Sequence, residues 1–220
     1  VMGDQGKKTQ RIFGVMARAS KAGGADIQDS VAMIASAMKG YGNVSEAQAK
    51  KIADLSFNTA KLGDTTFKEL AANMQPLFPL SNSLNMSYEE LYGTMSTLTG
   101  VTGDTANVTT QMKGFMSALI KPSTAMKSMM EKYGYASGEA MIKAKGFAGV
   151  LGIVKKETGG SSTELGKLFK NQRGLIAATA LTGQQYDTYI EKTNKLKNST
   201  NAATVAFEKM EGTPAEKLRK

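Results

Sequence analysis

The sequence contains no cysteine, no histidine and no tryptophan. Without cysteine the chain has neither a disulfide framework nor thiolate chemistry, and without histidine it lacks the usual zinc ligand and the usual general base at neutral pH. These absences exclude many classes of enzyme, so we expect no catalytic residue, no metal site and no cofactor. Aromatic residues make up only 7% of the chain, which leaves alanine, leucine and fourteen methionines to build an adaptable core.

Long apolar runs are also missing. No run reaches the ~18 residues of a transmembrane helix, and no charged segment followed by an apolar one indicates a signal peptide. Basic residues, in contrast, are in excess and give a formal net charge of +9. Such a charge is compatible with binding nucleic acid, an acidic membrane face or an acidic protein, and also with a plain solvated surface.

The distribution of the basic residues favours the solvated surface. They are spread along the chain, mixed with acidic residues near the end, and no aromatic residues interleave with them to stack on bases. Lys167, Lys170 and Arg173 form a local cluster on what the pattern predicts to be one helix. Contact with DNA or an acidic partner is the alternative interpretation of this cluster.

The rest of the chain is organised around residues 87–123. Ser87 and Glu90 form a capping box, in which the serine oxygen accepts from the amide three residues on and the glutamate reaches back to the amide of the serine. Apolar residues follow at helical spacing until Gly103 ends the pattern, and a second helical pattern then runs to Pro122. The sequence therefore predicts a helical hairpin.

Similar start and stop signals recur elsewhere. Pro76 and Pro79 are expected to end or kink the helix that precedes them, and no alternating run indicates a strand. We therefore predict an all-α fold, a compact bundle of about ten short helices with turns punctuated by glycine and proline. Further capping boxes are expected at Ser45 with Gln48, Thr66 with Glu69, and Ser161 with Glu164.

Several stretches have a sequence more specific than a generic helix pattern. They are residues 41–70, 87–103, 108–123, 146–151 and 165–174. In this order they resemble the conserved N-terminal region of phage tail tape measure proteins. The positions that carry the resemblance, and that we treat as candidate motif residues, are Tyr41, Gly42, Ser45, Asp54, Phe57, Gly63, Thr66, Phe67, Glu69, Leu70, Ser87, Glu90, Leu91, Thr99, Gly103, Thr110, Lys121, Pro122 and Phe169.

One departure from the family pattern is mild. The glycine that usually precedes the helix of Ser87 is replaced by Asn85, and asparagine tolerates the same left-handed turn. From the residues alone, glycines and capping residues would only punctuate the helices, and Phe57 and Phe67 would fill the core.

The resemblance implies a structural, non-enzymatic protein of the phage virion. It implies a chain that is made in the host cytoplasm, occupies the lumen of the tail tube, templates tube length and is released on infection. The implied partners are the tail tube protein, tail assembly chaperones and further copies of the chain. The alternative that we keep open is a basic helical module that binds DNA or the host membrane during genome delivery.

The predicted organisation has three parts. Residues 1–25 form an N-terminal helix or linker, residues 26–212 form the conserved helical domain, and residues 213–220 begin a downstream helix with Pro214 at its first position. A continuous helix of 220 residues would span ~330 Å at ~1.5 Å per residue. The frequent glycine and proline breaks argue against such a rod, so we expect the helix that sets length to lie downstream of Thr213.

Overall fold

The computed structural model describes residues 3–198 and 200–212. Within them the chain forms thirteen α-helices and no strand, which confirms the all-α class, although the helices are more numerous than the ten or so expected. In order they are α1 (Asp4–Gly23), α2 (Ile27–Gly40), α3 (Glu46–Leu62), α4 (Phe67–Asn73), α5 (Leu77–Ser83), α6 (Tyr88–Thr102), α7 (Thr105–Ile120), α8 (Thr124–Lys132), α9 (Gly138–Thr158), α10 (Ser162–Leu168), α11 (Gln172–Thr182), α12 (Tyr186–Lys197) and α13 (Ala202–Glu211).

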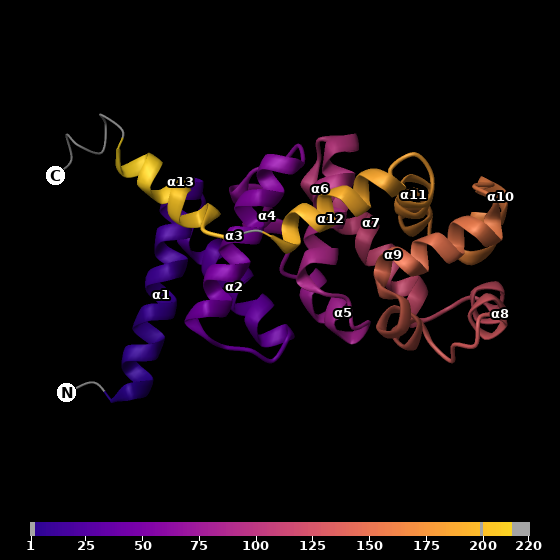
Figure 1. Ribbon diagram of the computed structural model, residues 1–220, viewed down its shortest axis with the longest axis horizontal. Helices are drawn as coiled ribbons and strands as arrows, with labels where there is room; N and C mark the ends of the chain where they lie inside the picture. The colour runs from indigo at the N-terminus through magenta and orange to yellow at the C-terminus, as the bar shows by residue number, and fades with distance from the viewer. Residues whose placement is uncertain (1–2, 199, 213–220) are drawn as a thin grey trace.

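The helices are arranged along one long axis (Figure 1). The first helix, α1, packs against the last, α13, at one end, and α8 and α10 lie at the other. One continuous cluster of buried apolar side chains runs through the bundle. The predicted hairpin of α6 and α7 lies in the middle, with α3 and α12 against α6 and with α11 against α7.

Helix α6 is buried on every side, because each residue from Leu91 to Thr99 is inaccessible to solvent. The hydroxyl groups of its buried threonines donate to carbonyls one turn earlier in the same helix, for example Thr94 to Glu90 at 2.8 Å and Thr97 to Gly93 at 2.7 Å. These bonds satisfy the hydroxyls inside the helix itself. Helix α6 can therefore be surrounded by other helices although many of its residues are polar.

Helices α7 and α11 cross with their backbones in contact. A Cβ atom on Gly114 would lie 2.6 Å from the backbone nitrogen of Gly174, and one on Gly174 would lie 2.7 Å from the carbonyl carbon of Gly114. Only glycine fits on both sides of this crossing. Beside it, the ring of Phe115 lies 4.7 Å from that of Phe169 and 5.4 Å from that of Phe147.

Local signals in the sequence predicted most helix starts correctly. Reciprocal capping boxes are present at Thr66 and Ser87, and Asn85 adopts the predicted left-handed conformation with φ 55°. Asp104 and Ser137 also cap the helices that follow them. All of these contacts join residues a few positions apart, which is the range that sequence patterns describe.

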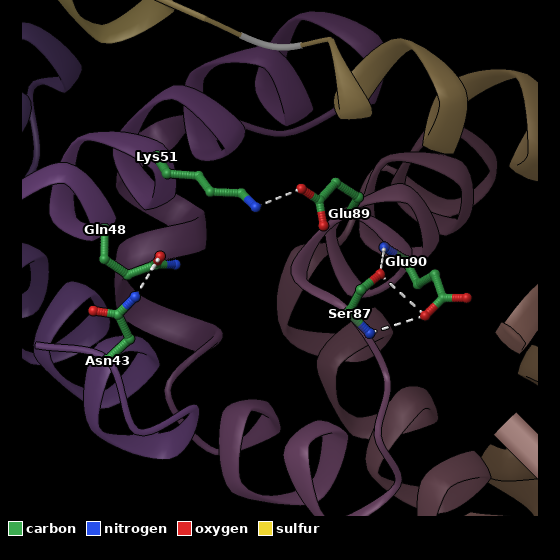
Figure 2. Close-up of polar contacts among 6 residues, drawn as sticks. All are labelled: Asn43, Gln48, Lys51, Ser87, Glu89 and Glu90. Atoms are coloured by element: carbon green, nitrogen blue, oxygen red, sulfur yellow. Dashed lines mark hydrogen bonds and ion pairs between the residues drawn. The ribbon is translucent and has the colours of Figure 1, made fainter. Parts of the chain in front are cut away.

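Two predicted capping boxes are only half formed. The hydroxyls of Ser45 and Ser161 accept from the amides three residues on, as predicted. The Gln48 side-chain oxygen, however, accepts from the Asn43 amide at 3.4 Å (Figure 2). Glu164 forms an ion pair with Lys167, 2.6 Å away, so the side chains of Gln48 and Glu164 are engaged with other partners than the amides of their serines.

Two breaks fall elsewhere than expected. Pro76 precedes α5 as expected, but Pro79 lies within the first turn of α5. Proline is tolerated there because the N–H groups of the first turn have no acceptor within the helix, so no hydrogen bond is lost. A second break, which no proline marks, lies inside α9: the helix is kinked at Gly146, whose φ of 68° and ψ of 168° are not helical. The predicted start at Thr213 lies outside the described residues.

Candidate functional site

The candidate motif residues do not converge on a cleft with paired acids and bases. Within residues 3–198 and 200–212, no group of three or more acidic side chains could hold a metal ion. In the same part of the chain, no helix combines the length and the apolar character needed to cross a bilayer. Several motif residues instead lie where helices distant in sequence meet, and this network of junctions is the candidate site.

The first junction joins the end of α2 to the start of α6. The rings of Tyr41 and Tyr88 stack with centroids 3.9 Å apart. The Tyr41 hydroxyl donates to the carbonyl of Met86 at 2.8 Å and lies 2.7 Å from the Ser81 hydroxyl, while Tyr88 donates to the carbonyl of Ala37 at 2.9 Å. Burial raises the pKa of the Tyr41 hydroxyl and raises that of Tyr88 to about 12. Both hydroxyl groups therefore stay protonated, and their hydrogen bonds together with the stacked rings hold the two helices together.

A polar layer lies between α3 and the start of α6 (Figure 2). Lys51 forms an ion pair with Glu89 at 2.8 Å, and its ammonium lies 5.9 Å from the centre of the Tyr88 ring. Ser87 and Glu90 lie beside this pair and close the capping box of α6. The start of α6 is thus bound to α3 by charge as well as by packing.

The carboxylate of Glu90 caps two helices at once. Its Oε2 accepts from the backbone nitrogen of Ser87 at 2.9 Å and from the Ser87 hydroxyl at 3.0 Å, which completes the capping box. Its Oε1 accepts from the backbone nitrogen of Phe147 at 2.6 Å. That amide is the first after the kink at Gly146, so Glu90 caps the second half of α9.

Asp54 plays the same part at another junction. From the middle of α3 its Oδ2 accepts from the backbone nitrogen of Asn201 at 2.9 Å, and its Oδ1 accepts from that of Ala203 at 2.8 Å. Asn201 is the N-cap position of α13 but makes no side-chain capping bond of its own. The carboxylate that caps α13 therefore comes from a residue 147 positions earlier in the chain.

Two motif glycines make a close approach or a turn. Gly63 ends α3 so near to α6 that a Cβ atom would lie 2.5 Å from the Thr99 hydroxyl. Gly103 ends α6 with φ 64°, in the left-handed region that glycine favours. Gly42, a third motif glycine, also lies in the left-handed region, with φ 71° after α2.

The remaining motif residues serve packing or lie at the far end. Phe57 and Phe67 stack with ring centres 4.7 Å apart. Thr110 is half-buried and donates its hydroxyl to a carbonyl one turn earlier in α7. Leu70, Leu91 and Phe169 are buried in the core, whereas Lys121 is exposed and Pro122 half-buried between α7 and α8.

Sequence reasoning missed four residues that contribute to this network. Gly93 lies so close to α12 that a Cβ atom would meet the Thr193 hydroxyl, and Gly114 and Gly174 form the crossing described above. Lys192 donates to the carbonyl of Ser96 at 2.8 Å, and burial lowers the pKa of its ammonium. A glycine inside an otherwise helical pattern is the signal that could have revealed these close contacts.

Comparison with known proteins agrees with the resemblance seen in the sequence. A family model described as phage-related minor tail protein matches residues 2–183. The chain is 26% identical over 212 residues to the tape measure protein of Pneumococcus phage Dp-1, covering 93% of this chain and 18% of that protein. It is 24% identical over 209 residues to the probable tape measure protein of Clostridium phage phiCD119, covering 92% of this chain and 22% of that protein.

The chain thus spans about a fifth of the length of these curated relatives. No solved structure gives a significant match to it. The family match covers well over half of the chain, and the tape measure relatives cover nearly all of it. The chain therefore belongs to the phage-related minor tail protein family and is a structural protein of the phage tail.

Proposed function

We propose that this chain is a folded part of a tape measure protein that occupies the lumen of the tail tube, templates tube length during assembly and is released on infection. The two tape measure relatives support this role, since each aligns with more than nine tenths of the chain. Within that protein we assign the described region to assembly or delivery, and we assign length measurement to a helix downstream of Thr213.

The observation that carries this division is the shortness of the helices. The longest, α9, has 21 residues and is kinked at Gly146, so even when straight it would span only ~32 Å at ~1.5 Å per residue. If all 220 residues of the chain formed one continuous helix, that helix would span ~330 Å. The folded region thus contributes far less length per residue than a continuous helix.

Two in-frame deletions in the parent gene test the proposal. One removes the folded region and the other removes a segment of equal size downstream, and tail lengths are then measured by electron microscopy. We expect the downstream deletion to shorten tails by ~330 Å, the length of an equal helix, and the first deletion to reduce the number of tails without a proportional shortening. If removal of the folded region shortens tails in proportion, the division is wrong.

The proposed partners are the tail tube protein, tail assembly chaperones and further copies of the chain. Phe13 on α1 and Val205 on α13 support such contacts, because about half of each side chain is exposed on helices that pack against each other. Sedimentation of the purified chain at increasing concentration tests self-association, and serine at both positions should weaken it. Copurification of the tagged parent protein from cells making tails tests the other two partners, which should both be lost with the folded region deleted.

A further inference from the structure

The junction between α7 and α8 separates two surface hollows, and Lys121 lines both. The first hollow, about 280 Å³, lies between α7 and the segment that joins α10 to α11, and Lys170 stands on its other side. The second, about 480 Å³, lies between the end of α7 and the start of α9 and includes Lys127 of α8. We call Lys121, Lys127 and Lys170 the lysine surface.

A side-chain contact brings two of these lysines to the same surface. The hydroxyl of Ser123 donates to the carbonyls of Lys167 and Leu168, at 3.0 and 3.1 Å, and so ties the start of α8 to the end of α10. This contact brings the segments of Lys121 and Lys170 together although they are far apart in sequence. Phe169 ends the helix before Lys170, so the cluster with Lys167 and Arg173 is divided between α10 and α11 rather than lying on the one helix predicted.

The lysine surface is not neutralised. No acidic residue lines either hollow, and all three ammonium groups are exposed without an ion pair in the described part of the chain. Elsewhere lysines do find partners, such as Lys51 with Glu89. Three unpaired positive charges around two hollows attract an anionic partner.

The other residues that line the two hollows indicate which kind of anion fits. Small side chains, among them Gly114, Ser117 and Ala136, let a partner approach the helix surface closely, and they stand beside apolar residues such as Ile120 and Leu168. The hollows contain no aromatic residue to stack on unpaired bases and no arginine to grip a carboxylate with two bonds.

Lysine instead acts as a point charge towards phosphate, and protein interfaces are depleted of lysine. We propose that the lysine surface binds the phosphate backbone of duplex DNA without reading its sequence. The proposal does not depend on how tail length is set, because it concerns the end of the bundle opposite α1 and α13.

Fluorescence anisotropy of a short labelled DNA duplex with the purified 220-residue chain tests the proposal. The test variant carries Lys121→Gln, Lys127→Gln and Lys170→Gln. The control carries Lys7→Gln, Lys8→Gln and Lys39→Gln, which removes the same number of exposed positive charges from another part of the molecule. Binding constants are measured between about 50 mM and about 200 mM salt, because released counterions report the number of phosphate contacts.

We expect the unchanged chain and the control to show the same salt dependence. For the test variant, the slope of log K against log salt should be shallower by about 2.7, since each lost phosphate contact contributes about 0.9. Equal losses in both variants would overturn the proposal, because they would reflect net charge alone. It would also be overturned if the unchanged chain bound polyglutamate, or vesicles with about one third phosphatidylserine, but not duplex DNA.

Discussion

Replacing Glu90 by glutamine should loosen α6 and α9 together. The carboxylate accepts from the backbone nitrogens of Ser87 and Phe147 through different oxygen atoms. Glutamine offers only one oxygen, so its amide group must face one of these N–H groups. The substitution therefore leaves one donor without an acceptor, whichever way the new side chain turns.

The loss should be about 2 kcal/mol, since a hydrogen bond to a charged group contributes about 1.5–3 kcal/mol and a weaker neutral bond remains. For a domain of this size the midpoint of thermal unfolding should fall by ~4–8 °C. Glu89→Gln is the matched control, because it removes one negative charge from the neighbouring position. The pair of Glu89 with half-exposed Lys51 should contribute no more than about 1 kcal/mol.

Chemical denaturation gives the free energy of unfolding for both variants, and amide hydrogen exchange reports on the junction itself. The Phe147 amide should exchange faster in Glu90→Gln and should be unchanged in Glu89→Gln. Our account of the double cap would be refuted if the two variants lost the same stability within about 0.5 kcal/mol, or if exchange at Phe147 did not change.

Three further predictions follow from the other contacts. Asp54→Ala should cost about 1 kcal/mol, as lost helix caps do, and hydrogen exchange should accelerate across α13 but not across α6; uniform acceleration would contradict the capping role. Gly114→Ala should destabilise the chain by about 1–3 kcal/mol through overpacking, measured by denaturant titration. In the control Gly14→Ala, the added methyl group meets no atom within 4 Å, and the same titration should show α1 stabilised by up to about 1 kcal/mol. Burial raises the pKa of Tyr88 to about 12 and also raises that of Tyr92. Above the unfolded-state pKa of about 10, the folded chain therefore keeps protons that the unfolded chain loses. The free energy of unfolding should fall as pH rises above about 10, by up to ~1.4 kcal/mol per pH unit for each tyrosine. Tyrosinate absorbance should then rise together with the loss of helical circular dichroism, and an earlier rise at all tyrosines would contradict this burial effect.

The sequence was most informative about where helices begin. The capping residues Thr66, Ser87 and Asp104 each accept from the amide three positions on, and such contacts are visible as spacing. The conformation of Asn85 could be predicted for the same reason, since asparagine tolerates the left-handed turn wherever it occurs.

The partners of the motif carboxylates could not be predicted. Glu90 reaches an amide 57 positions later and Asp54 one 147 positions later, and nothing in the local pattern fixes such distances. The burial of α6 could not be predicted from the sequence for another reason. Residues such as Thr94 and Thr97 look exposed in a hydropathy pattern, but their hydroxyls bond within the helix and need no water.

The contact between α1 and α13 determines how the bundle responds to tension. Because these two helices lie at the same end of the long axis and both pack against α3, a force that separates them acts first on the contacts among α1, α3 and α13 (Figure 1). Helix α13 has a single fully buried residue, Ala202, and is held at its start by Asp54. Tension applied between α1 and α13 is therefore expected to separate α13 from α3 and α1 before it disturbs the helices at the other end.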